Sequence, residues 1–311
     1  MISILCPCYN EEAVLPLFFQ RITAVMEKVM EETGEPFEIV CVNDGSRDGT
    51  LELLRAQAAS DGRVKVVDLS RNFGKEAALT AALDYSSGDA VVPIDADLQD
   101  PPELIQDMVE KWREGYDVVL ARRADRSSDS WLKRFSALMF YRVHNAISQP
   151  RIPENVGDFR LMDRRVVEAL GTLRETRRFM KGLFAWVGFR TYTLDYTREV
   201  RAAGTTKFNA WRLWKLAVEG MTSFSTAPLT VWSYFGGLTA LCAFLYGLYI
   251  LLRTLILGVE LPGYASQFCL ILLFGGLQLL GIGILGEYLG RTYMESKRRP
   301  IYLVREVYEG Q

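Results

Sequence analysis

The chain contains a single histidine, His144, among 311 residues. Catalysis by a serine or cysteine nucleophile ordinarily needs a histidine base beside it, and His144 falls in a segment with the pattern of an amphipathic surface helix. A catalytic Ser-His or Cys-His pair is therefore not expected. The five cysteines lack the paired spacing of a metal site and lie in apolar runs, which predicts small apolar residues in a protein of a reducing compartment.

Charge of either sign is not in excess. The formal net charge is −2 and charged residues make up 24% of the chain, a balance that gives no reason to expect nucleic acid as a partner. Met1 leads directly into an apolar run without a basic leader or a cleavage site, so we expect no signal peptide. The sequence contains no internal repeat and no low-complexity segment.

Two long segments lack charged residues altogether. No Asp, Glu, Lys or Arg occurs in residues 220–252 or 261–286, and about 20 apolar residues suffice to cross a bilayer. We predict two transmembrane helices, at about 229–253 and 264–286, within a membrane domain at 229–288. The alternative is a helical hairpin buried in a soluble core, but such helices rarely continue this far without a charge.

Basic residues flank the two apolar segments on one side. They cluster before the first segment and after the second, whereas the connecting loop has only Arg253 at its edge. Because Lys and Arg are retained in the cytoplasm, we predict a multi-pass protein of the inner (plasma) membrane with its N-terminal domain and both termini cytoplasmic. Residues 289–311 would form a cytoplasmic C-terminal tail. Glycines in the second segment would allow packing against another helix, including one of a second copy in a homo-oligomer.

Short β-branched runs alternate with helical patterns through residues 1–125. Apolar residues three and four positions apart, as in 15–29, predict helices in the gaps. The alternation predicts an α/β domain with a mostly parallel, Rossmann-like sheet whose ligand site lies at the carboxyl ends of the strands. The predicted strands are 2–6, 37–42, 64–69, 90–94 and 117–121.

Polar residues fill the loops after the first four predicted strands, at 7–12, 43–50, 70–76 and 95–103. Each loop by itself could merely form a turn or cap the helix that follows. Because the carboxyl ends of parallel strands meet at one edge of a sheet, the four loops together predict one polar crevice.

Asp95 and Asp97 lie one residue apart at the end of the fourth predicted strand. Carboxylates this close raise each other's pKa unless a cation compensates them. Oxygen ligands suit Mg²⁺ or Mn²⁺, which take one or two protein carboxylates and leave positions for phosphate oxygens. We therefore predict a divalent metal held by Asp95, Asp97 and Gln99, bridging a diphosphate.

Residues 126–228 carry basic and aromatic segments in place of the α/β pattern. Amphipathic spacing at 132–143 and 208–221 predicts helices in the lipid headgroup layer, with packing on the domain itself as the alternative, and 192–196 alternates as a strand does. An anionic lipid headgroup would need cations between these helices and the crevice, although any one of them could be an ordinary surface cation. The candidates are Arg122, Arg123, Arg134, Arg201 and Lys207.

The loop sequences resemble those of GT-A fold, family 2 glycosyltransferases, and within them the polyprenyl-phosphate sugar transferases related to dolichyl-phosphate mannose synthase. The resembling motifs are Pro7-Cys8-Tyr9-Asn10-Glu11-Glu12, Asn43-Asp44-Gly45-Ser46, Asn72-Phe73-Gly74-Lys75 and Asp95-Ala96-Asp97-Leu98-Gln99-Asp100-Pro101-Pro102-Glu103. Three further motifs look most like the bactoprenol glucosyltransferase branch. They are Gly157-Asp158-Phe159-Arg160-Leu161, Gly204-Thr205-Thr206-Lys207-Phe208 and Gly286-Glu287-Tyr288-Leu289-Gly290-Arg291. The resemblance covers essentially the whole chain, and departs from the family where Cys6 and Cys8 replace β-branched residues.

The resemblance implies a role for each site residue. The nucleotide sugar would contact Pro7, Tyr9, Glu11, Asp44, Ser46, Lys75 and Asp95. The metal would bind Asp95, Asp97 and Gln99, and the polyprenyl phosphate would bind Arg122, Arg134, Arg201 and Lys207. Asp97 and Asp158 would be the catalytic residues, Asp158 as a base or as a group that orients the acceptor. The alternative for Asp158 is a turn or helix cap paired with Arg160.

The expected function is an inverting transfer of one sugar, glucose from UDP-glucose, onto polyprenyl (undecaprenyl) phosphate. A phosphate oxygen is already anionic near pH 7, so its attack needs no strong base. GDP-mannose, UDP-aminoarabinose and UDP-galactose are alternative donors, and a membrane nucleotide-sugar sensor without turnover is a non-enzymatic alternative. A processive polysaccharide synthase is not expected, because such enzymes generally carry a Gln-x-x-Arg-Trp motif that this sequence lacks.

Overall fold

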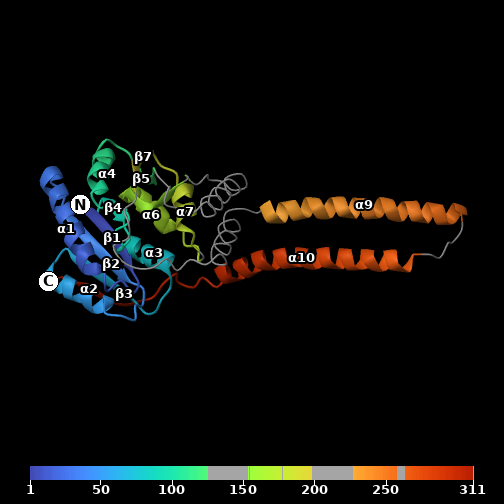
Figure 1. Cartoon of the computed structure of the whole chain (residues 1–311), viewed down its shortest axis with the longest axis horizontal. Coiled ribbons are helices and arrows are strands. Elements are labelled where there is room, and N and C mark those ends of the chain that lie inside the picture. The colour runs from blue at the N-terminus through green and yellow to red at the C-terminus, as the bar shows by residue number, and fades with distance from the viewer. Residues whose placement is uncertain (125–152, 154, 177, 198–226, 258–262, 311) are drawn as a thin grey trace. The chain divides into compact units, whose positions relative to one another are not determined.

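The computed structural model describes residues 1–124, 153, 155–176, 178–197, 227–257 and 263–310. The chain divides into two compact units, one formed by Met1–Gly220 with Arg299–Gln311 and the other by Met221–Arg298. The first unit contains an eight-stranded sheet with its helices, and the second contains two long helices (Figure 1). The amphipathic stretches predicted at 132–143 and 208–221 lie outside the described residues, as do His144, Arg134, Arg201 and Lys207.

The sheet has the strand order β7-β5-β6-β4-β1-β2-β3-β8. Its strands are β1 (Ile2–Cys8), β2 (Phe37–Asn43), β3 (Val64–Leu69), β4 (Ala90–Pro93), β5 (Val118–Arg123), β6 (Val156–Asp163), β7 (Thr191–Tyr196) and β8 (Val304–Glu309). Only β6 and β8 pair antiparallel with their neighbours among the described strands. The strand order reverses at β1, which pairs with β2 on one side and β4 on the other, and open α/β sheets bind ligands beyond the strand ends at such a point.

The central strands are apolar because helices cover both faces of the sheet. In β1 every residue except Pro7 is buried. Helices α1 (Leu15–Thr33), α2 (Thr50–Ser60) and α4 (Leu104–Arg113) pack their apolar side chains into one core cluster with Ile4 and Ile39.

Helix α3 (Lys75–Tyr85) packs against β1 and β2, but its buried residues lie outside that core cluster. Since strand side chains alternate between faces, α3 covers the opposite face, next to α6 (Arg164–Thr172). A further short helix, α7 (Met180–Trp186), contacts β6. The structure confirms the predicted α/β class with its mostly parallel sheet.

Two strands lie outside the predicted ones. Residues 156–163 form β6, so Asp158 is part of a strand and is not the turn or helix cap considered from the sequence. Residues 304–309, in the expected C-terminal tail, form β8 on the edge of the sheet beside β3. The strand predicted at 192–196 is present as β7.

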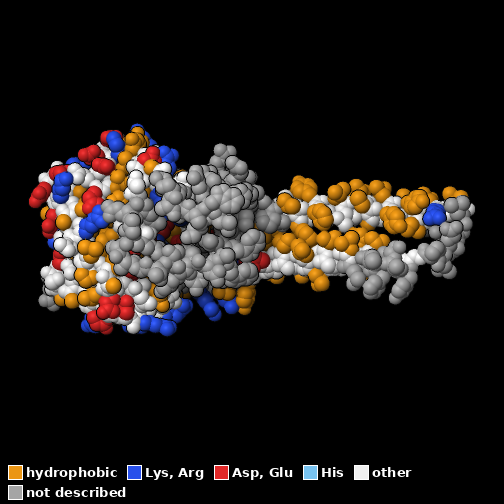
Figure 2. Space-filling view, in the orientation of Figure 1, with side chains coloured by type: hydrophobic (Ala, Val, Ile, Leu, Met, Phe, Trp, Pro, Cys, Tyr) orange, Lys and Arg blue, Asp and Glu red, His pale blue; other side chains and the backbone are white. Residues whose placement is uncertain are grey.

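The second unit consists of α9 (Ala227–Leu257) and α10 (Tyr264–Ser296). Both are long and apolar enough to cross a membrane, over Leu229–Ile250 and Leu273–Ser296, and none of the residues in these windows is buried. Hydrophobic side chains line both helices (Figure 2); Phe244 and Leu279, for example, are exposed. The described residues therefore give no support to a hairpin buried in a soluble core. Helix α10 continues past residue 286, where the predicted span ended.

Candidate active site

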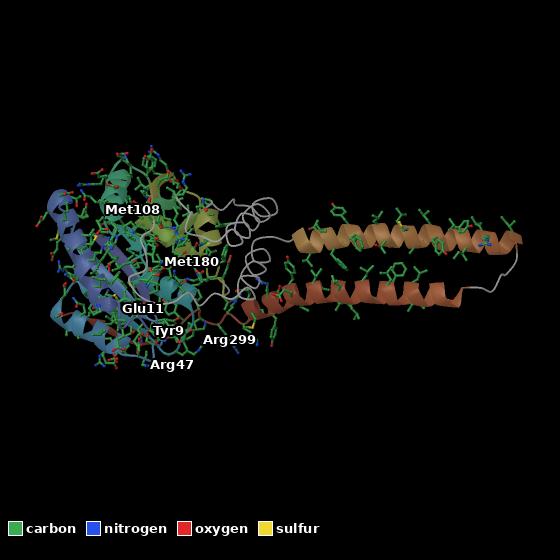
Figure 3. All side chains as sticks on the ribbon, in the orientation of Figure 1. Tyr9, Glu11, Arg47, Met108, Met180 and Arg299 are labelled. Atoms are coloured by element: carbon green, nitrogen blue, oxygen red, sulfur yellow. The ribbon has the colours of Figure 1, made fainter. Side chains whose placement is uncertain are left out.

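The polar loops after β1 and β2 are joined by hydrogen bonds at the carboxyl edge of the sheet. The backbone N–H of Asn10 donates to Ser46 Oγ at 3.1 Å, and the N–H of Arg47 donates to Asn10 Oδ1 at 2.9 Å. The N–H of Glu11 donates to Thr50 Oγ1 at 2.9 Å, which ties the first loop to the start of α2. Figure 3 shows Tyr9, Glu11 and Arg47 in this region. Tyr9 is exposed, as a residue that stacks on a ligand needs to be.

Asp44 joins the second loop to the third. Its buried carboxylate accepts the backbone N–H groups of Phe73 at 2.7 Å and Gly74 at 3.0 Å. Burial raises the pKa of Asp44, and these two hydrogen bonds oppose the rise. Asp44, predicted to contact the nucleotide, thus also shapes the loop that leads into α3.

Lys75, the first residue of α3, forms the charged centre of the edge. Its Nζ lies 2.7 Å from Asp95 Oδ1 and 2.9 Å from Asp158 Oδ2. Burial would lower the pKa of Lys75, but the two carboxylates outweigh it and raise the pKa. Burial would likewise raise the pKa of Asp158, but the positive charges of Lys75 and Lys181 lower it to about 2. The structure therefore brings three predicted site residues from α3, the loop after β4 and β6 into direct contact.

The loop after β4 has a constrained backbone. Leu98 is buried and has a left-handed φ of 53°, which is costly for a residue with a branched side chain and is a feature of functional loops. The N–H of Gln99 donates to Asp97 Oδ1 at 3.2 Å. Gln99 Oε1 is buried and has no hydrogen-bond partner in the described part of the chain.

These groups fit an oxygen-binding cation. Burial first, and then neighbouring charges including those of Asp97 and Asp95, raise the pKa of Glu11 to about 7. A divalent cation would relieve this crowding of carboxylates, and Gln99 Oε1 would gain a partner. Among the described residues, no three His, Cys, Asp or Glu side chains form a metal-binding group, but Mg²⁺ commonly uses only one or two carboxylates.

The cations predicted to bind the lipid headgroup are only partly described. Arg122, at the end of β5, donates from Nε to Asp195 Oδ1 at 2.6 Å and from Nη2 to Asp195 Oδ2 at 2.8 Å, and both side chains are exposed. Arg123 Nη2 lies 4.0 Å from Asp100 Oδ1. The other three cations are outside the described residues.

Two residues at this edge, Glu76 and Asp68, were not among the predicted site residues. Glu76 lies next to Lys75 and accepts the N–H of Met180 at 3.2 Å, and burial together with the charge of Asp158 raises its pKa to about 7. Asp68, at the end of β3, is buried and bonded to Asn43. The one signal in the sequence that could have identified Asp68 is its place between apolar residues, Val67 and Leu69, at the end of a predicted strand.

The chain matches known glycosyltransferases along most of its length. The family model described as Glycosyl transferase family 2 matches residues 3–171. An uncharacterised glycosyltransferase of Synechocystis sp. is 51% identical over 99% of this chain and 95% of its own length.

Two relatives have more specific names. A prophage bactoprenol glucosyl transferase homolog of Escherichia coli is 51% identical over 98% of this chain and 99% of its own. The bactoprenol glucosyl transferase of Shigella phage SfV is 52% identical over 98% of each. As the loop motifs predicted, the chain belongs to glycosyl transferase family 2.

Proposed function

We propose that the protein transfers one glucose unit from UDP-glucose to a polyprenyl phosphate, undecaprenyl phosphate being the expected lipid, at the cytoplasmic face of the membrane. The observation that carries this proposal is the contact of Lys75 with both Asp95 and Asp158 at the carboxyl edge of the sheet, in a chain that also has two exposed apolar helices. Family membership and the names of the relatives point to the same reaction.

The nucleotide would lie over the joined first and second loops. The exposed Tyr9 ring is available for stacking on the base, and Glu11 and Ser46 lie in the loops around it. Asp44 and Pro7 would form the floor of the pocket, from the loop after β2 and the end of β1. Lys75 carries the positive charge that a diphosphate needs.

Mg²⁺ or Mn²⁺ would be held by Asp95, Asp97 and Gln99 and would stabilise the charge that develops on the leaving diphosphate. Asp97→Ala is expected to abolish transfer and leave membrane insertion intact. Glu110→Ala, which removes an exposed carboxylate on α4, is the matched control and should keep wild-type turnover. Full activity of Asp97→Ala would contradict the metal assignment.

Asp158 is suited to orienting the acceptor. A carboxyl group with a pKa of about 2 is a weak base, and a phosphate oxygen is already anionic near pH 7. In the proposed step this oxygen forms a bond to the anomeric carbon as the bond from that carbon to UDP breaks, with inversion. Positioning and stabilisation of the leaving group supply most of the rate.

The acceptor would reach the site from the membrane. Arg122, Arg134, Arg201 and Lys207 would bind its phosphate, and α9 and α10 would anchor the chain with both termini in the cytoplasm, as the flanking basic residues predict. Residues 1–125 would hold the nucleotide sugar and 126–228 the acceptor. The glycines of α10 would allow association with a second copy.

Incubation of the purified protein with Mg²⁺, a short polyprenyl phosphate and one radiolabelled donor at a time tests the proposal. UDP-glucose should give a chloroform-soluble sugar, and UDP-galactose, GDP-mannose or UDP-aminoarabinose should give less. If product forms only with another donor, the assignment of glucose as the sugar is wrong, but the proposed type of reaction stands. Nucleotide binding without product from any donor would favour a sensor, and a growing polymer would favour a processive synthase.

A further inference from the structure

The C-terminal strand β8, which contains none of the predicted site residues, begins beside the carboxyl end of β3. It pairs antiparallel with β3, and a register shift between Asp68 and Leu69 interrupts the pairing where β3 ends. The N–H of Ser70 donates to the carbonyl of Leu303 at 2.9 Å. The segment that follows α10 is therefore bonded to the first residue of the third polar loop.

Arg305, on β8, makes two contacts at this end of β3. Its Nη1 lies 3.3 Å from Asp68 Oδ2, and its Nη2 donates to the carbonyl oxygen of Ser70 at 2.9 Å. The Asp68 side chain is 1% exposed and that of Arg305 is 57% exposed. Arg305 is the only cation paired with Asp68 in the described residues. A buried carboxylate is costly unless it is paired, so Arg305 compensates a charge that the fold has placed below the surface.

Asp68 also contacts Asn43, the first residue of the second polar loop. Its Oδ1 accepts Asn43 Nδ2 at 2.8 Å, which fixes the orientation of the Asn43 amide. Asn43 Oδ1 then faces the N–H of Ser46 and accepts it at 3.2 Å. Ser46 Oγ in turn accepts the N–H of Asn10 in the first loop.

We infer that Arg305 is a positioning residue for nucleotide binding, because it holds Asp68, Asn43 and Ser46 in the arrangement that shapes the first two loops. The inference rests on the proposed function, in which those loops bind the nucleotide. Through Arg305, the strand that follows the second apolar helix governs the affinity of the site for the donor.

The other end of β8 provides a matched control. Lys65 Nζ and Glu309 Oε1 form an ion pair 3.1 Å apart across the same two strands. Among the described residues, no hydrogen bond links this pair to the polar loops. Its carboxylate is 63% exposed, and an ion pair that is open to solvent contributes little.

The test uses the full-length protein in detergent and measures the Kd for UDP with Mg²⁺ by calorimetry. Arg305→Met removes the contacts to Asp68 and Ser70 and should raise the Kd about tenfold. Arg305→Lys, which restores the charge without the planar fork, should recover most of the affinity. Lys65→Met should stay within about twofold of the wild type. In turnover assays Arg305→Met should raise KM for the donor and leave kcat at saturation within about twofold.

The double variant Arg305→Met with Asp68→Asn is a second arm, because it removes the uncompensated charge and keeps an acceptor for Asn43. It should bind UDP more tightly than Arg305→Met alone. An unchanged Kd in Arg305→Met, or an equal loss in Lys65→Met, would overturn the inference. Binding of UDP is measured without turnover, so failure of the wild type to form a lipid product would refute the proposed function and leave this test intact.

Discussion

Gly45 and Gly34 both have a left-handed backbone, with φ of 64° and 75°, but only Gly45 is crowded. A Cβ at Gly45 would lie 2.5 Å from the backbone nitrogen of Asn72, whereas Gly34 has nothing within 4 Å. Glycine is therefore needed at position 45 for a close approach of two backbones, and at position 34 only for its φ angle.

Gly45→Ala is expected to push the third loop away from the second. Both Gly45→Ala and Gly34→Ala incur a backbone penalty of about 1 kcal/mol, but only the first also overlaps backbone atoms. We expect the Kd for UDP to rise about tenfold in Gly45→Ala, since overpacking of this kind typically costs 1–3 kcal/mol. Gly34→Ala should bind UDP as the wild type does. Equal Kd values for the two variants in calorimetry would contradict the contact.

Glu76 gives the protein a pH-dependent stability. Its pKa is about 7 in the folded chain, against an ordinary value of 4.5. Between these values the folded chain keeps a proton that the unfolded chain has lost, so the free energy of unfolding falls as the pH rises. Glu76→Gln should remove a penalty on the order of 2 kcal/mol at pH 8.

Thermal unfolding at pH 5 and pH 8 measures this effect. The variant should melt above the wild type at pH 8, and the two melting temperatures should converge at pH 5. A smaller dependence should remain in the variant, because the pKa of Glu11 is also raised to about 7. The same difference between variant and wild type at both pH values would contradict the assignment.

For single residues, the sequence predicted which side chains share the site, but it predicted less well which of them contact each other. Asp95 and Lys75 were expected together because both follow strands of one parallel sheet, and the structure places them in contact. The contacts of Asp68 and Glu76 depend on burial and on residues distant in sequence, Arg305 for Asp68 and Met180 for Glu76. No local pattern encodes such pairs.

At the scale of elements, strands with continuous apolar runs were predictable. β1 to β5 lie between turn signals, and most of their residues are apolar and buried, so their composition identifies them. β6 carries Asp158, Arg160 and Asp163 within eight residues, because it is next to the charged centre. β8 is an edge strand that mixes polar and apolar residues without a regular alternation, and its pairing with β3 depends on residues far away in the sequence.

The two apolar helices approach each other closely at one glycine. A Cβ at Gly281 on α10 would lie 2.1 Å from Nε1 of Trp232 on α9, whereas Gly283 has nothing within 4 Å. The absence of a side chain at Gly281 therefore leaves room for the Trp232 ring between the two helices.

Gly281→Leu should therefore destabilise the helix pair, and Gly283→Leu should not. We expect the melting temperature in detergent to fall by about 2–4 °C for Gly281→Leu, because overpacking costs about 1–3 kcal/mol. Tryptophan fluorescence during heating measures it. Identical melting curves for the two variants would show that Trp232 does not pack on Gly281.

At the scale of the whole molecule, the basic residues around the apolar segments predict which parts share a side of the membrane. A cysteine introduced at Glu260, between the helices, should react with a membrane-impermeant maleimide in right-side-out vesicles. One introduced at Lys297, after α10, should react only in inside-out vesicles. The wild type gives the background from Cys242. Labelling of both positions from the same side would rule out two spanning helices.

In the proposed reaction, the site around Lys75, Asp95 and Asp158 joins one sugar to a lipid phosphate. The most direct measurement is the intact mass of the lipid recovered after incubation of the purified protein with UDP-glucose, Mg²⁺ and polyprenyl phosphate. We expect the wild type to form a lipid phosphate that carries a single hexose, and Asp158→Ala to form none. An unmodified lipid, a lipid with several sugars, or the same product from Asp158→Ala would contradict the proposed reaction.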